Sequence, residues 1–117
     1  LVYIPSAFEK TIAFTQKEAE FYFQINKHEQ KNLNIELVSI PKISGKIKID
    51  NKILDNFTIG SFQTKQIKIK INLNQIQNDI SKISIIVDKC WNINHIYKLF
   101  PNFPLGVGIK SIKITTY

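Results

Sequence analysis

Apolar and polar residues alternate with a period of two along much of the chain. The clearest stretch covers residues 66–73, where Ile67, Ile69 and Ile71 fall on one side and lysines and amides fall on the other. A helix cannot keep this period on one face, whereas a half-buried β-strand does. The same pattern recurs over residues 20–26, 32–40, 44–49 and 82–88.

Turn-forming residues predict a hairpin in the middle of the chain. Asp50 and Asn51 tolerate the backbone of a tight turn, and they separate the alternating stretch 44–49 from residues 52–54. Residues 15–19 are predicted to form another turn, and residues 74–80 a loop or a short helical turn.

The last strand, residues 105–116, breaks the alternation once. Ile109 and the residues before it share one face, but Ile112 and Ile114 belong by parity to the other. One extra residue near Lys110-Ser111 would return both isoleucines to the core, so the sequence predicts a β-bulge there.

Many short strands with turn signals between them, and no helical pattern, predict an all-β fold. We expect residues 1–117 to form one antiparallel two-sheet β-sandwich. The chain begins at Leu1 rather than Met, which suggests a module of a longer protein. Residues 90–104 are the longest irregular stretch, and such loops carry function more often than strands do.

Charge is the second feature of the sequence. The net charge is +7, and all 16 basic residues are lysine. Codons for Ile, Lys and Asn are AT-rich, so a low-GC organism accounts for this choice. A basic surface attracts polyanions, but lysine lacks the planar guanidinium group with which arginine makes bidentate hydrogen bonds to phosphate. The outward residues Lys46, Lys48, Lys68 and Lys70 would form one basic surface if their strands share a sheet, and are otherwise solvated faces.

Three pieces of the chain resemble a family of small jelly-roll modules. They are residues 105–114, residues 14–23 and the hairpin 46–54, in the order and spacing typical of that family. The family is the galactose-binding-like or carbohydrate-binding-module type, found beside bacterial and archaeal glycan-handling enzymes. The resemblance covers about residues 8–117. Residues 101–104 depart from the family, which commonly has Asp and Arg there, so no role of those groups is carried over.

Sugar binding needs aromatic faces that stack on a pyranose and amides that hydrogen-bond its hydroxyls. The irregular stretch offers both kinds of side chain. The predicted carbohydrate contacts are Trp91, Asn92, Asn94, His95, Tyr97, Asn102 and Phe103. Alternatively, Trp91 and Phe100 plug one end of the sandwich and contact no ligand.

The sequence gives little support for catalysis or for metal binding. Cys90 and His95 are a thiol and an imidazole five residues apart, a spacing that implies no contact, and we expect no enzyme activity. The scattered acidic residues match no metal-binding loop. No cofactor and no catalytic metal are expected. Modules of the family that the chain resembles often hold a structural calcium ion, but the sequence identifies no ligands for one.

Three functions follow as hypotheses. The first is a non-catalytic carbohydrate-binding or accessory module, whose partners are a glycan or the other domains of a parent enzyme. The second is a nucleic-acid-binding barrel of the OB type, and the third is a structural protein-interaction module. The sequence has no membrane-spanning stretch and no signal peptide, and it leaves the compartment unknown.

Overall fold

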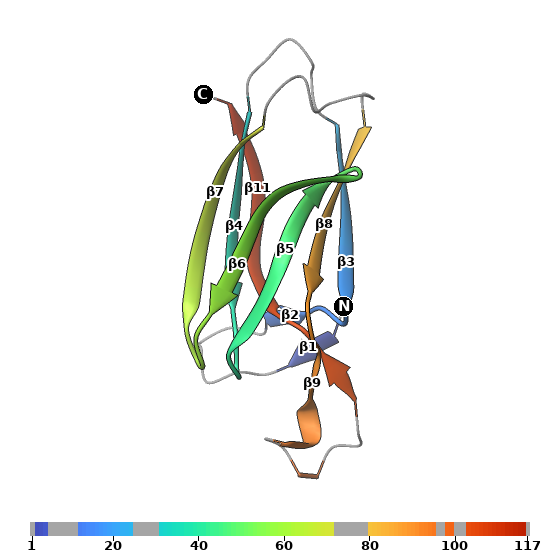
Figure 1. Cartoon of the computed structure of the whole chain (residues 1–117), viewed down its shortest axis with the longest axis vertical. Coiled ribbons are helices and arrows are strands. Elements are labelled where there is room, and N and C mark those ends of the chain that lie inside the picture. The colour runs from blue at the N-terminus through green and yellow to red at the C-terminus, as the bar shows by residue number, and fades with distance from the viewer. Residues whose placement is uncertain are drawn as a thin grey trace.

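The computed structural model describes residues 2–4, 12–24, 31–71, 80–95, 98–99 and 103–116. Their strands pair antiparallel and form two main sheets that pack face to face (Figure 1). The strands are β1 (Val2–Ile4), β2 (Ile12–Phe14), β3 (Glu18–Gln24), β4 (Lys31–Val38), β5 (Ile43–Ile49), β6 (Lys52–Ile59), β7 (Thr64–Ile71), β8 (Ile80–Val87), β9 (Trp91–Asn92), β10 (Pro104–Leu105) and β11 (Gly108–Thr116). The predicted fold, an all-β antiparallel sandwich, is confirmed.

The chain crosses repeatedly between the two sheets. One sheet has the strand order β1-β2-β11-β4-β7, and the other has the order β3-β8-β5-β6. Only β5 and β6 are long strands that follow one another within the same sheet. A small third sheet, β9 with β10, lies with the 3-10 turn η2 (Ile93–His95) at one end of the sandwich, opposite the C-terminus (Figure 1).

The core lies between the sheets and consists mainly of the inward isoleucines. Each fully buried isoleucine or leucine stabilises the fold by about 1.5–3 kcal/mol before chain entropy is counted. The inner faces bury Leu33, Ile35 and Leu37 of β4, Ile47 and Ile49 of β5, Phe57 and Ile59 of β6, Ile67 and Ile71 of β7, and Ile83, Ile85 and Val87 of β8.

Five of the predicted strands correspond to β3, β4, β5, β7 and β8, with ends shifted by about two residues. β6 is longer than the predicted residues 52–54, because Phe57 and Ile59 continue its inward face. The short strands β1 and β2 were not predicted from the alternation. The predicted loop 74–80 lies outside the described residues except for Ile80.

The predicted β-bulge and the predicted tight turn at Asp50 are both present. The register of β11 against β4 shifts between Ile109 and Ser111, which confirms the bulge. Asp50 has a φ of 50°, the left-handed conformation that a tight turn requires. The Lys82 amide donates to Asp50 Oδ1 at 3.0 Å, and the Asp50 amide donates to the Lys82 carbonyl at 2.7 Å, so the turn is fastened to β8.

Trp91 closes one end of the core. Its side chain is only 9% exposed, and its Nε1 donates a hydrogen bond of 2.8 Å to the Gly106 carbonyl. The Phe14 ring meets it edge to face, with ring centres 6.1 Å apart. Thr15 fastens the same region, because its amide donates to the Val107 carbonyl and its carbonyl accepts from the Gly106 amide.

Gly45 is required by the close approach of two neighbours. A Cβ at this position would lie 2.3 Å from the Ile86 carbonyl oxygen and 2.7 Å from Cζ of Phe57. Phe57 is the cross-strand partner of Gly45, and its ring covers the space that a side chain would take. A backbone atom cannot yield as a flexible side chain can, so any side chain at this strand position would force the sheet to shift.

We expect Gly45→Ala to lower the free energy of unfolding by about 1–3 kcal/mol, because the added methyl group overpacks the sheet. Urea denaturation followed by circular dichroism measures the change. Lys46→Ala, on the outward side of the same strand, is the control and should stay within about 0.5 kcal/mol of wild type. Equal stability of Gly45→Ala and wild type would contradict this packing.

Trp91 is the only tryptophan in the chain, so its fluorescence reports on this one site. We expect acrylamide to quench it weakly in the folded protein and strongly in urea, because the ring is buried. Trp91→Phe should cost about 2–3 kcal/mol, since it leaves the Gly106 carbonyl without its donor and removes ring volume. Quenching in the folded protein as strong as in urea would show that the ring faces solvent.

Candidate functional site

Of the predicted carbohydrate contacts of residues 91–103, the structure describes the side chains of Trp91, Asn92, Asn94 and Phe103. β9 and β10 pair, and the Ile93 amide donates to the Phe103 carbonyl at 3.1 Å. The beginning and the end of the segment 91–105 therefore lie side by side. Asn92 and Asn94 are half-buried, and the Oδ1 atom of each is buried without a hydrogen-bond partner. Phe103 is 38% exposed. The predicted contacts Tyr97 and Asn102, and the side chain of His95, lie outside the described residues.

Trp91 belongs to the hydrophobic core at one end of the sandwich. Its indole N–H is bonded within the protein, and its ring packs against Phe14, so little of the side chain meets solvent. A carbohydrate contact by Trp91 stays a prediction, while the burial of its ring agrees with the alternative that it plugs the end of the sandwich. The indole is held in place by its hydrogen bond to the Gly106 carbonyl, an acceptor that the pairing of β9 with β10 brings close to Trp91.

Trp91 also contributes to the wall of a depression of about 260 Å³ at this end. The other lining residues are Pro41, Lys42, Ile43, Lys89 and Cys90. Cys90 is half-buried and forms no disulfide. No described carboxylate or imidazole lines this depression.

The four lysines of the predicted basic surface lie on two different sheets. Lys46 and Lys48 are on β5 in the four-stranded sheet, whereas Lys68 and Lys70 are on β7 in the five-stranded sheet. All four point away from the core, because the residues between them are inward isoleucines. The two pairs therefore face opposite sides of the sandwich and do not form one surface.

The outer face of the four-stranded sheet carries an exposed aromatic side chain, Tyr22. Its ring is 65% exposed, and its hydroxyl donates to Glu20 Oε2 at 3.3 Å. Glu20 Oε1 forms an ion pair with Lys82 Nζ at 3.5 Å, and Lys82 is the cross-strand partner of Tyr22. The three side chains thus form one cluster, which we call the Tyr22 cluster, on adjacent strands.

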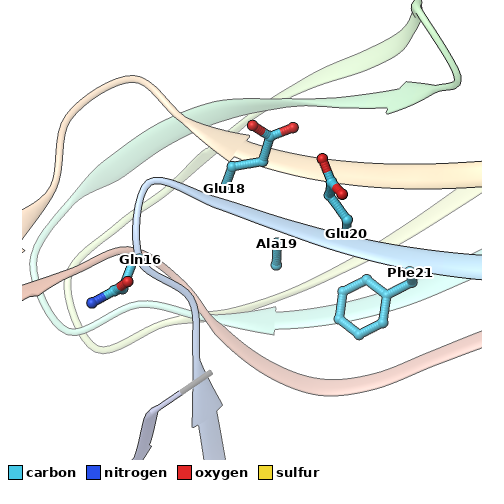
Figure 2. A pocket seen from close by; sticks show the side chains of 5 residues that line it. All are labelled: Gln16, Glu18, Ala19, Glu20 and Phe21. Carbon is cyan, nitrogen blue, oxygen red and sulfur yellow. The ribbon is translucent and has the colours of Figure 1, made fainter.

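A depression of about 210 Å³ lies beside this cluster, at the start of β3. Its lining residues are Gln16, Glu18, Ala19, Glu20 and Phe21. Figure 2 shows the carboxylates of Glu18 and Glu20 on one side of the β3 ribbon and the side chains of Ala19 and Phe21 on the other. The depression is smaller than an enclosed ligand pocket of roughly 300–1,000 Å³. It suits a ligand that lies along the surface.

The alternation of residues 20–26 places Tyr22 outward, but sequence reasoning did not single it out as a binding residue. The signal that could have found it is an aromatic residue on the polar side of an alternating strand. Such a residue gains nothing from the core and exposes an aromatic face that a ligand can stack on.

The described residues contain no group of three or more side chains suited to hold a metal ion. Among these residues there is also no helix with the length and apolar character needed to cross a membrane.

Of three comparisons with known proteins, the one with solved structures gives a match. No model of a protein family matches the sequence, and no curated protein matches it. The structure is similar to the crystal structure of the CBM36-1 domain of a multidomain xylanase from the hindgut metagenome of Trinervitermes trinervoides, with a TM-score of 0.60. The similarity covers 97% of this chain and 83% of that one, at 9% sequence identity. The chain therefore has the β-sandwich fold of a carbohydrate-binding-module type of domain.

Proposed function

We propose that this chain is a non-catalytic carbohydrate-binding or accessory module of a glycan-related enzyme, with the Tyr22 cluster as its sugar-contact surface. The observation that carries the proposal is the Tyr22 ring, 65% exposed on a flat polar face and held by a hydrogen bond to Glu20. The fold similarity to a domain of a multidomain xylanase supports it.

The physical demands of sugar recognition match the Tyr22 cluster. A pyranose presents an apolar face of C–H groups, which packs on an aromatic ring, and a rim of hydroxyls, which needs donors and acceptors. Glu20 supplies acceptors and Lys82 supplies donors directly beside the ring. The bond from Tyr22 to Glu20 fixes the ring before ligand arrives, so binding costs less side-chain entropy.

The carboxylates beside Tyr22 suit binding better than hydrolysis. Glu18 and Glu20 are two residues apart on one face of β3, a spacing of about 7 Å between Cα atoms. Paired carboxylates at such a distance serve inverting glycosidases, but the acid of the pair must stay protonated in a shielded environment. Both residues are exposed, and Glu20 is paired with Lys82, so neither carboxylate lies in such a shielded environment.

The described predicted contacts Asn92, Asn94 and Phe103 are a second candidate contact region, at the end of the sandwich. Phe103 offers a partly exposed ring there, and Asn92 and Asn94 offer amides. If the chain works as an accessory module, the parent enzyme's other domains would be its partners.

Titration with neutral xylan and glucan oligosaccharides, after a glycan array, tests the proposal. We expect Tyr22→Ala to weaken binding of the best ligand about tenfold, because an aromatic contact contributes roughly 1 kcal/mol or more. Tyr22→Phe keeps the stacking ring and should stay within about threefold of wild type. Calorimetry or affinity electrophoresis measures both.

Phe62→Ala is the matched control, since Phe62 is a 63% exposed aromatic in the turn between β6 and β7. It should bind like wild type. If Phe103→Ala rather than Tyr22→Ala abolishes binding, the contact surface is the end of the sandwich. Failure of every glycan to bind would overturn the proposed function.

A further inference from the structure

The outer face of the five-stranded sheet carries a row of three polar side chains on adjacent strands. Asn34 of β4 pairs in register with Lys68 of β7 on one side and with Lys113 of β11 on the other. Both lysines are exposed. Two strand spacings separate their backbones, roughly 10 Å, so their flexible side chains can bring both ammonium groups to one anion above Asn34.

The neighbouring positions leave the positive charge of this row uncompensated by β4, β7 and β11. Glu36 is the one carboxylate along these three described strands, and its Oε1 already lies 3.6 Å from Nζ of Lys110. The Asn34 amide donates to Thr115 Oγ1 at 2.9 Å, which fixes its orientation in the row. Amides and hydroxyls, which can bind sugar hydroxyls, surround the two lysines.

The same strands lack the groups that nucleic acid recognition uses. None of β4, β7 and β11 contains an aromatic residue, so these described strands offer no platform on which bases stack. The chain also has no arginine for bidentate contacts with phosphate. Lysines interspersed with amides and hydroxyls suit a chain of sugars that bears carboxylates.

We propose that this face binds an acidic polysaccharide, with a carboxylate held between Lys68 and Lys113 and the flanking hydroxyls bound by Asn34 and its neighbours. The carboxylate gains charge-assisted hydrogen bonds from two ammonium groups. This surface is on the opposite side of the sandwich from the Tyr22 cluster. The proposal adds a second, charged class of ligand to the proposed function. It is tested independently of sugar binding at the Tyr22 cluster.

Polygalacturonate and its fully methyl-esterified form are suitable probes, because they share a backbone and differ in charge. We expect the protein to bind polygalacturonate and not the ester, with affinity that falls as salt rises because exposed charges are screened. Lys68→Gln with Lys113→Gln should weaken binding about tenfold, as expected for the loss of two exposed charge contacts. Affinity electrophoresis at two salt concentrations measures this.

Lys46→Gln with Lys48→Gln is the matched control, since it removes the same charge from the other sheet. It should leave polygalacturonate binding within about twofold of wild type. Equal losses in both double variants would show that net charge alone attracts the polymer, and would overturn the proposal. Tighter binding of single-stranded oligodeoxythymidylate than of polygalacturonate would overturn it in favour of nucleic acid. Tyr22→Ala distinguishes the two surfaces, because it should affect neutral sugars only.

Discussion

Burial of alternate isoleucines between the two sheets is the interaction on which the rest of the structure depends. Strand side chains point to opposite faces in turn, so choosing the inward residues also chooses the outward ones. Ile83 and Ile85 are fully buried on β8, which places Lys82 outward beside Tyr22. Ile67 is buried on β7 in the same way, which places Lys68 outward. The choice of inward residues therefore also determines which side chains the two outer faces expose.

The alternation was enough to predict the fold class, most of the long strands and the bulge after Ile109. These are local properties, because the period and its break are visible within a few residues. Strand pairing is not local: nothing near Lys48 or Lys68 indicates which sheet each strand joins, so the two lysine pairs could not be assigned to opposite faces. The burial of Trp91 likewise depends on Phe14 and the Gly106 carbonyl, which are far from it in sequence.

The two outer faces differ in the kind of contact that they offer. The four-stranded sheet exposes an aromatic ring with carboxylates and one paired lysine, whereas the three long strands of the five-stranded sheet expose lysines, amides and hydroxyls without a ring. One face offers apolar stacking, which salt does not weaken, and the other offers charge, which salt screens. A change in ionic strength would therefore separate their contributions.

The position of β11 also has a consequence for how the chain folds. This strand is the last of the described strands, yet it lies between β2 and β4, and the Val107 amide just before it donates to Thr15 Oγ1. Until residues 108–116 leave the ribosome, β4 has only β7 as a neighbour and exposes an open edge. Contacts between residues so distant in sequence form slowly, and open edges promote aggregation. The growing chain is thus prone to aggregation until β11 has been synthesised and pairs with β4.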